Sequence, residues 1–149
     1  MLVEQLIASK YKLKPGERFS YNSTNNIITY VPNLLKTRVG KLALLHEIAH
    51  ANLKHYFYNF DIELFTMEIE AWEETKRLAA QYNISLNNIY IEECLSSYDR
   101  WLTRRTTCPR CKTFSYQKTN DTFFCYSCDI TWKVNKRKDR RVRRVVIQN

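Results

Sequence analysis

Glycine and proline are scarce in this chain of 149 residues, which contains only two glycines and three prolines. Flexible linkers rich in glycine are therefore not evident, and no internal repeat or low-complexity tract is present. The chain also lacks a long apolar run, and its first residues, MLVEQLIASKYK, include the acidic Glu4 and no basic leader. We therefore expect neither a secretory signal nor a membrane span, and we expect a cytoplasmic protein.

Acidic residues become rare in the last third of the chain. Up to Tyr98 the sequence has 10 Lys/Arg and 11 Asp/Glu, whereas from Asp99 onward it has 14 and 4. The formal net charge of +9 therefore divides into −1 before Asp99 and +10 from Asp99 onward. The basic segment also holds four of the five cysteines. The length leaves room for a domain of roughly 100 residues and one small module.

Hydrophobic periodicity predicts both helices and strands. The segment RFSYNSTNNIITYVP alternates on both sides of Asn25-Asn26, which favours a β-hairpin, and its second strand, 26–31, is expected to offer an edge to an extended peptide. Apolar residues recur at three- and four-residue spacing further along the chain, which favours helices. The predicted helices cover residues 2–11, 37–58, 62–82 and 89–102.

The segment HEIAH, from His46 to His50, lies in the second predicted helix. Two histidines four residues apart project side by side from one helix face, which suits two positions of a tetrahedral zinc site. The intervening Glu47 would lie beside the metal, where a carboxylate can take a proton from zinc-bound water and pass it to a leaving amine. The neighbouring residues, LALLHEIAHANL, are largely apolar, and unpaired imidazoles are disfavoured on a buried face. The pattern predicts a catalytic zinc bound by His46 and His50, with Glu47 as general base and acid.

A catalytic zinc needs a third protein ligand. The metzincin pattern would require a histidine at the position of Tyr56, and His55 is expected to point about a quarter turn away as a surface or packing residue. The next predicted helix is rich in glutamate, and Glu68 is the one that falls on its apolar stripe. Because a carboxylate among apolar neighbours requires a strong partner such as zinc, we choose Glu68 as the third ligand, with Glu70 as its main rival.

HEIAH followed by EIEAWEETKRLAA resembles the ImmA/IrrE-like zinc metallopeptidases, whose second helix commonly carries a Glu-x-x-Ala pattern followed by an apolar stretch. The resemblance covers roughly residues 42–80. It implies a third-ligand role for Glu68, with Ala71 as the alanine, and a substrate such as a phage-type repressor or a related transcriptional regulator. Two positions depart from the family pattern, since Ala49 replaces the usual glycine and Trp72 replaces a small polar residue.

Four cysteines form two Cys-x-x-Cys pairs, CPRC (Cys108 and Cys111) and CYSC (Cys125 and Cys128). Two such knuckles separated by thirteen residues are typical of a zinc ribbon, because each one turns the chain so that two thiolates converge. A cytosolic chain keeps its thiols reduced, which disfavours disulfides, and a zinc ion would supply folding free energy that so small a core lacks. The pattern predicts a structural zinc held by these four cysteines. The fifth, Cys94, is expected to be a small core residue.

The chain closes with WKVNKRKDRRVRRVVIQN, a dense run of basic residues. Such a run can neutralise phosphates and release counterions, which gives affinity for nucleic acid. The ribbon's aromatic residues can form a stacking surface or simply its core. A solvated end, an acidic protein partner and a strand formed by RVRRVVIQN remain open alternatives. The candidate nucleic-acid-binding residues are Lys136, Arg137, Lys138, Arg140, Arg141, Arg143 and Arg144.

We predict an α+β protein in three segments. These are a small zincin-like helical metallopeptidase domain with a short β-hairpin (1–102), a zinc ribbon (103–134) and a basic tail (135–149). The predicted activity is hydrolysis of peptide bonds in a protein substrate, with one catalytic and one structural Zn²⁺ ion.

Two alternative functions are consistent with the same HEIAH and cysteine motifs. The first is a nucleic-acid-binding ribbon protein whose HEIAH unit is inactive or structural. The second is a protease acting on DNA-bound proteins, similar to the SprT-type family, which takes its third zinc ligand from a histidine. No histidine follows His55 in this chain.

Overall fold

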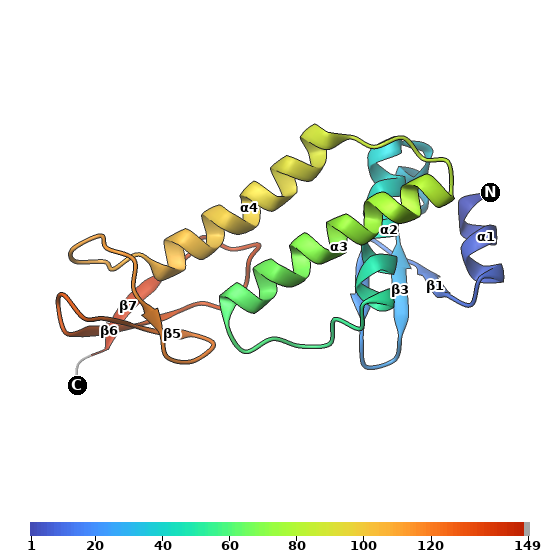
Figure 1. Cartoon of the computed structure of the whole chain (residues 1–149). Coiled ribbons are helices and arrows are strands. Elements are labelled where there is room, and N and C mark those ends of the chain that lie inside the picture. Colours follow the sequence, from blue (N-terminus) through green and yellow to red (C-terminus); the bar gives the residue numbers. More distant parts are fainter. Residues whose placement is uncertain (148–149) are drawn as a thin grey trace. The chain divides into compact units, whose positions relative to one another are not determined.

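The computed structural model describes residues 1–147, in which helices are combined with two small sheets (Figure 1). The predicted mixed α+β class is confirmed. No helix within the described residues is both long and apolar enough to cross a membrane. The helices are α1 (Leu2–Ala8), the 3₁₀ helix η1 (Pro32–Lys36), α2 (Arg38–Asn52), α3 (Asp61–Gln81) and α4 (Asn88–Thr106). The strands are β1 (Lys12–Pro15), β2 (Ser20–Asn22), β3 (Ile27–Tyr30), β4 (Tyr116–Gln117), β5 (Thr122–Cys125), β6 (Ile130–Val134) and β7 (Arg144–Ile147).

The chain divides into two compact units. The first consists of Met1–Phe57 and Thr66–Glu93, and the second of Tyr58–Phe65 and the chain from Cys94 onward. These units do not coincide with the predicted segments 1–102, 103–134 and 135–149, because α3 and α4 are continuous helices that each contribute residues to both units.

The sheet of the first unit has the strand order β1-β3-β2. The predicted hairpin is present, with β2 antiparallel to β3, and β1 is an additional strand that pairs in parallel with β3. Because β3 is paired on both sides, the expectation of an open edge along 26–31 is wrong. The outer strands of the sheet are β1 and β2, and β2 packs against α2.

Helix α2 begins and ends at specific local signals. The Thr37 side chain accepts a hydrogen bond from the Gly40 N–H at 3.0 Å and thereby caps the first turn. A Cβ on Gly40 would lie 1.9 Å from the Leu34 carbonyl oxygen, so only glycine fits there. The helix ends well before the predicted Tyr58, because Lys54 adopts a left-handed conformation (φ 56°) and the His55 N–H bonds back to the His50 carbonyl oxygen at 3.1 Å. This arrangement is a Schellman motif, which reverses the chain direction at the helix end.

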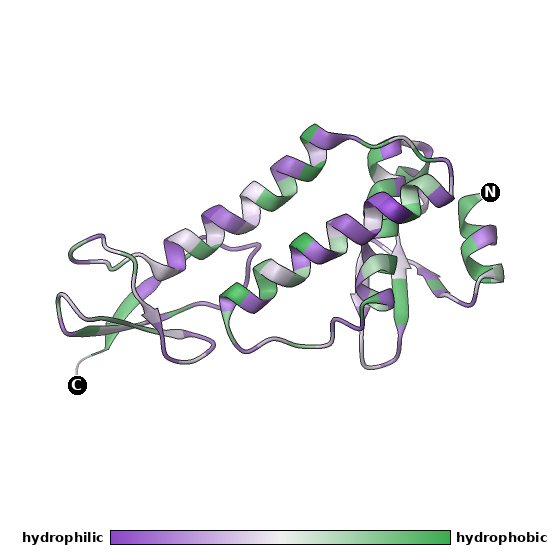
Figure 2. Cartoon of the chain, viewed as in Figure 1, coloured by the Kyte–Doolittle hydropathy of each residue, from purple (hydrophilic) through white to green (hydrophobic). Residues whose placement is uncertain are grey.

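The core of the first unit gathers apolar residues from four elements, α1, β3, α2 and α3, whose hydropathy is coloured in Figure 2. Burying each leucine or isoleucine side chain stabilises the fold by about 1.5–3 kcal/mol. Both α2 and α3 turn apolar faces into this core, so the HEIAH segment is held on a packed helix. The buried residues are Leu6, Ile28, Leu42, Leu44, Leu45, Ile48, Ala49, Ala71, Leu78 and Ala79.

The second unit contains an antiparallel sheet in the order β4-β5-β6-β7. Strands β4 and β5 are joined by residues 118–121. On one face of the sheet, Phe123 and Trp132 stack with ring centroids 5.8 Å apart and are fully buried. The core of this sheet is small, and Cys108 and Cys125 belong to it together with Phe123, Ile130, Trp132 and Val134.

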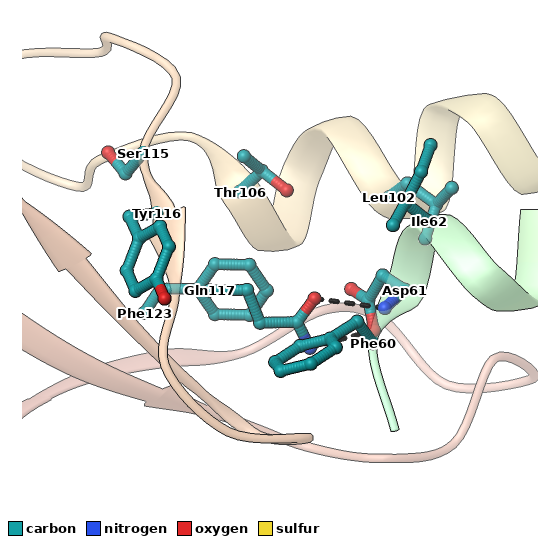
Figure 3. Close-up of a pocket in the computed structure, with 9 residues that line it drawn as sticks. All are labelled: Phe60, Asp61, Ile62, Leu102, Thr106, Ser115, Tyr116, Gln117 and Phe123. Atoms are coloured by element: carbon teal, nitrogen blue, oxygen red, sulfur yellow. Dashed lines mark hydrogen bonds between the residues drawn. The ribbon is translucent and has the colours of Figure 1, made fainter. Parts of the chain in front are cut away.

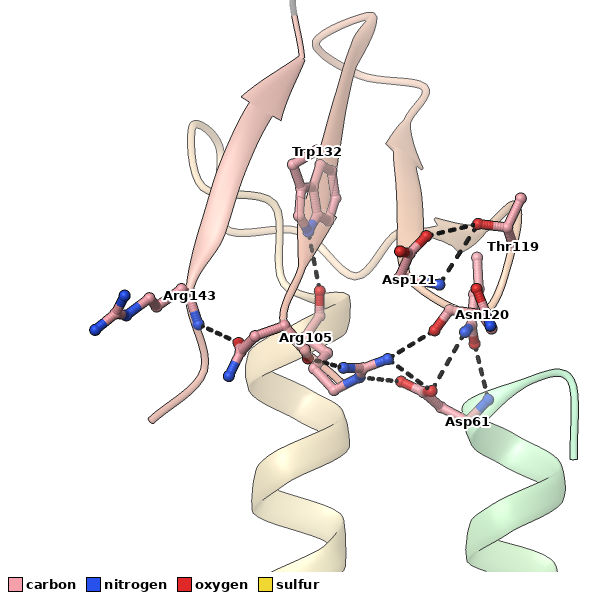
Figure 4. A network of polar contacts seen from close by, with 9 residues as sticks. Asp61, Arg105, Thr119, Asn120, Asp121, Trp132 and Arg143 are labelled. Atoms are coloured by element: carbon pink, nitrogen blue, oxygen red, sulfur yellow. Dashed lines mark hydrogen bonds and ion pairs between the residues drawn. The ribbon is translucent and has the colours of Figure 1, made fainter. Parts of the chain in front are cut away.

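A buried ion pair ties the sheet to the helices of the second unit (Figure 4). The Arg105 guanidinium on α4 donates to both carboxylate oxygens of Asp61 on α3, at 2.7 and 3.2 Å, and the two side chains are only 2% and 6% exposed. Arg105 also donates to the backbone carbonyls of Asn120 and Asn135, while the Trp132 indole N–H donates to the carbonyl of Arg105 itself. One arginine therefore joins two helices and two segments flanking the strands.

The basic tail is part of the sheet in its last described residues. Residues 144–147 form β7, which pairs with β6 from Thr131↔Ile147 to Val134↔Arg144. The Asn135 side chain bonds to the Arg141 carbonyl oxygen and to the Arg143 N–H, which orders the approach to β7. The alternative in which this end of the chain forms a strand is therefore the one observed, because its β-branched residues complete the sheet.

Candidate metal centres

His46, His50 and Glu68 converge in the first unit. The two histidine Nε2 atoms lie 3.1 Å apart, and the Glu68 oxygens lie 3.0 Å from His46 Nε2 and 3.3 Å from His50 Nε2. In a tetrahedral zinc site with bonds of about 2.0–2.1 Å, neighbouring ligand atoms are separated by about 3.3 Å. The 3.0 Å contact is made by Glu68 Oε2 and the 3.3 Å contact by Glu68 Oε1, and one donor atom from each of the three residues lies within 4.8 Å of the others, so together they could hold one metal ion.

Burial separates Glu68 from its rival Glu70. The Glu68 side chain is 6% exposed, whereas that of Glu70 is 55% exposed and contacts His55 instead. Burial by itself raises the pKa of Glu68, but hydrogen bonds from His46 and His50 and their positive charge outweigh it and lower this pKa to about 2. Glu68 is therefore an ionised carboxylate at neutral pH, which is the form that binds metals.

Glu47 is half-buried close to the two histidines and within electrostatic reach of Glu68. Its burial raises its pKa, against the charge of His46 and His50 and a hydrogen bond from the Tyr21 backbone, which both lower it. The hydrogen bond to Tyr21 ties Glu47 to β2, the edge strand of the sheet. The structure thus places an additional carboxylate between the candidate metal ligands and an open sheet edge.

His55 contacts the candidate ligands through His50. Its Nδ1 atom lies 2.9 Å from His50 Nδ1, and its Nε2 atom lies 3.2 Å from the Glu70 carboxylate. Burial lowers the pKa of His55, with a further contribution from His50, so this ring is neutral at pH 7. The expectation that His55 points away is wrong, because it assumed that α2 continues, whereas the Schellman motif at Lys54 returns the chain to His50.

Trp72 packs directly on the site. Its ring stacks on that of His46 with centroids 4.1 Å apart and an angle of 25° between the planes, and Tyr90 contacts Trp72 edge to face. Trp72 lies four residues after Glu68, so both side chains project from the same face of α3. Trp72, which replaces the small polar residue of the ImmA/IrrE-like pattern, therefore holds the plane of the His46 ring. Its position on the apolar stripe was visible in the sequence, but its contact with His46 was not.

Cys108, Cys111, Cys125 and Cys128 form a second group in the second unit, with their sulfur atoms within 4.8 Å of one another. The residue after each knuckle, Lys112 or Asp129, has a positive φ, 66° and 52°. In the first knuckle the Lys112 N–H bonds to the Cys108 carbonyl oxygen, which closes the turn. Each knuckle thus ends in the same kind of turn. The turn points the two sulfur atoms of the knuckle inward, as a four-thiolate metal site requires.

Thr113 supports the cysteine group. Its hydroxyl lies 3.0 Å from the Cys111 sulfur and 3.7 Å from that of Cys125. Burial raises the pKa of Cys125, but hydrogen bonds from Thr113, Cys111 and the Cys128 backbone outweigh it and bring this pKa to about 6. A thiolate therefore forms readily within the cluster, and thiolates are the metal-binding form. Cys94 is half-buried and is not one of these ligands.

The candidate nucleic-acid-binding residues of the tail do not share one environment. Arg137 pairs with Asp139, the Lys138 ammonium donates to Ser97 and lies over the Tyr98 ring, and Arg144 donates to the Thr107 carbonyl. Four others expose their side chains to solvent, namely Lys136, Arg140, Arg141 and Arg143.

The second unit also contains a pocket of about 390 Å³ beside β4 (Figure 3). At its polar end, the Asp61 N–H donates to the Gln117 side-chain oxygen and the Gln117 amide donates to the Asp61 carboxylate. These groups are therefore already paired with each other. The lining residues are Phe60, Asp61, Ile62, Leu102, Thr106, Ser115, Tyr116, Gln117 and Phe123.

Comparisons of the chain with protein-family models, with curated proteins and with solved structures gave no match. The functional argument therefore depends on the two groups of metal-binding side chains and their surroundings.

Proposed function

We propose that this chain is a zinc-dependent metallopeptidase that hydrolyses peptide bonds in a protein substrate. The observation that carries the proposal is the convergence of His46, His50 and Glu68, whose Nε2 atoms and carboxylate make contacts of 3.0–3.3 Å, with Glu47 close to both histidines. Two imidazoles and one carboxylate leave a fourth tetrahedral position open, which distinguishes catalytic from structural zinc sites. The resemblance of HEIAH and EIEA to ImmA/IrrE-like peptidases supports the same assignment.

In this proposal His46, His50 and Glu68 hold the zinc, which when bound supplies a Lewis acid that polarises a carbonyl and lowers the pKa of a water molecule. Glu47 accepts a proton from the attacking water as the oxygen bonds to the scissile carbonyl carbon. The same carboxylic acid then donates that proton to the amine nitrogen as the C–N bond breaks. A raised pKa suits this alternation, because a carboxyl group with a pKa nearer neutrality both accepts and releases a proton readily.

The edge strand β2 is the proposed docking edge for the substrate. Its central residue, Tyr21, hydrogen-bonds through its backbone to Glu47, so a peptide added alongside β2 would pass the proposed general base. Addition of a strand to a sheet edge uses backbone hydrogen bonds and so holds an extended substrate without reading its sequence. The substrate class suggested by the resemblance is a repressor or a related transcriptional regulator.

The Cys108, Cys111, Cys125 and Cys128 group is proposed to hold a structural zinc. Four thiolates fill the coordination shell, which leaves no open position for chemistry. The SprT-type alternative receives less support, because that family takes its third ligand from a histidine, whereas the side chain that contacts the Nε2 atoms of both His46 and His50 is Glu68.

The test compares Glu47→Gln with the wild-type chain on a mixture of unstructured peptides, with cleavage read by mass spectrometry. Zinc-loaded wild type should cleave peptides, whereas Glu47→Gln should keep its metal and lose hydrolysis, since the amide cannot carry the proton. Glu73→Gln, an exposed change on α3, is the matched control and should retain full activity. Undiminished cleavage by Glu47→Gln would refute its role, and absence of cleavage by the zinc-loaded wild type would favour the nucleic-acid-binding alternative.

A further inference from the structure

The sheet of the second unit has two chemically different faces. Side chains alternate between the faces of a strand, and directly paired residues of antiparallel strands lie on the same face. One face carries Phe123, Cys125, Trp132 and Val134, which are between 0% and 4% exposed and form the core. The register places Tyr116 opposite Phe124, and Lys133 opposite Val145, on the other face.

Aromatic rings gather on this second face. Tyr116 is 56% exposed and Tyr126, on the second cysteine knuckle, is 75% exposed. The Tyr126 ring contacts Phe124 edge to face with centroids 4.8 Å apart, and its centroid lies 6.4 Å from that of Tyr116. Three neighbouring rings thus form a surface that is not needed for the core, since Phe123 and Trp132 fill that role.

Positive charge accompanies these rings. The Lys118 ammonium lies 4.9 Å from the centre of the Phe124 ring, and the Lys133 side chain, 61% exposed, extends from the same face with its ammonium 3.4 Å from the Asp121 carboxylate. The segment from Asp99 onward has a net charge of +10, so the surroundings are basic as well. An apolar partner is disfavoured on such a face, because it would have to remove these ammonium groups from water.

We propose that this face binds single-stranded nucleic acid. Bases would stack on Tyr116, Phe124 and Tyr126, and the ammonium groups of Lys118 and Lys133 would pair with phosphates. A single strand fits both features, because its bases have free faces for stacking and its backbone carries the complementary charge. A duplex buries its base faces, and an acidic protein surface would match the charge without using the rings. The site is independent of the proposed peptidase activity.

The test measures the binding of full-length zinc-loaded protein to fluorescein-labelled oligothymidylate, oligouridylate and a duplex of about 20 nucleotides, by fluorescence anisotropy over a series of KCl concentrations. Tyr116→Ala and Tyr126→Ala should each lower the affinity for single strands about tenfold or more, with little change in salt dependence, because they remove stacking but no charge. Lys118→Ala and Lys133→Ala should each reduce the slope of log affinity against log salt by about 0.7. Comparing oligothymidylate with oligouridylate shows whether the face accepts a DNA or an RNA strand. Tight binding to either one supports the proposal.

Phe114→Ala is the matched control, because Phe114 is 75% exposed in the same unit and makes no ring contact with the cluster. It should leave binding unchanged. The proposal is overturned if neither single strand binds at low salt, if the duplex binds more tightly than both, or if Phe114→Ala weakens binding as much as the tyrosine variants do. Zinc content measured on each variant separates lost contacts from lost folding, and Tyr126→Leu decides the matter should Tyr126→Ala lose its zinc.

Discussion

The Nδ1 atom of His50 lies 2.9 Å from the Nδ1 atom of His55, and this contact determines which nitrogen of His50 is available to a metal. The His55 Nε2 atom lies 3.2 Å from the Glu70 carboxylate, and a hydrogen bond from the ring to this acceptor places the proton of a neutral His55 on Nε2. Its Nδ1 must then accept, and His50 must donate from Nδ1. When His50 Nε2 gives its lone pair to a metal in place of its contact with Glu68, the remaining ring proton therefore lies on Nδ1, facing His55. The contacts from Glu70 to His55 and from His55 to His50 thus orient the His50 ring for metal binding.

His55→Ala is expected to weaken zinc binding at the His46, His50 and Glu68 group by about 10- to 100-fold, because the His50 ring loses the partner that sets its orientation. Glu70→Ala removes the partner of His55 rather than a partner of His50, so it should weaken zinc binding less. Competition titration with a zinc chelator measures both. Glu73→Ala, which removes only an exposed pair with Lys76, is the control. Unchanged affinity in His55→Ala would show that the contact with His50 has no positioning role.

Glu68→Ala is expected to abolish zinc binding at the histidine group, whereas Glu70→Ala should retain it at saturating zinc. The physical reason is that the Glu68 carboxylate lies at 3.0–3.3 Å from both histidine nitrogens, whereas that of Glu70 reaches only His55. Elemental analysis should give two zinc ions per chain for wild type and Glu70→Ala and one for Glu68→Ala, since the cysteine group is untouched. The reverse order would move the ligand role to Glu70.

The double variant Cys125→Ser and Cys128→Ser should lose the second zinc and, with it, the ordered sheet of the second unit. Its core is small, and metal binding is expected to supply much of its folding free energy. Amide hydrogen exchange should show that β5 and β6 lose protection while α2 keeps it. Cys94→Ser, which changes a cysteine outside the cluster, should leave both the zinc content and the protection intact. Persistent protection of β5 in the double variant would mean that the sheet is stable without metal.

Asp61→Asn is expected to destabilise the second unit by about 3–5 kcal/mol, because it leaves the buried Arg105 guanidinium without its charged partner. Urea denaturation of the zinc-loaded protein measures the loss. Asp139→Asn is the matched control, since its pair with Arg137 is largely exposed and should contribute little to stability. Replacing both buried partners, with Asp61→Leu and Arg105→Met together, should cost less than Asp61→Asn alone. An equal loss in Asp61→Asn and Asp139→Asn would show that burial of the pair is unimportant.

The basic residues of the tail lead into strand β7 and form its first position. Deleting residues 136–149 would remove β7 together with the basic side chains, so a loss of nucleic-acid binding would not separate charge from folding. Neutral substitutions at the exposed Arg140 and Arg141 keep the strand and change only the charge. They are the appropriate variants for testing the tail.

Features set by neighbouring residues were readable from the sequence alone. The four-residue spacing of His46 and His50 places both rings on one helix face, and the Cys-x-x-Cys spacing turns each knuckle inward, whatever the rest of the chain does. The apolar stripe of α3 likewise separated the buried Glu68 from the exposed Glu70. These patterns depend on contacts within about one helical turn, so local geometry is sufficient to specify them.

Only the tertiary structure decided the contacts between residues that no local rule connects. Lys54 has none of the usual signals for a helix end, yet its left-handed conformation brings His55 onto His50. The pairing of Arg105 with Asp61, 44 residues apart, and the sorting of the ribbon's aromatic residues into a core face and an exposed face depend on how helices and strands pack. Sequence periodicity specifies which side of an element is apolar, but the identity of the partner that covers that side is settled by the folded chain as a whole.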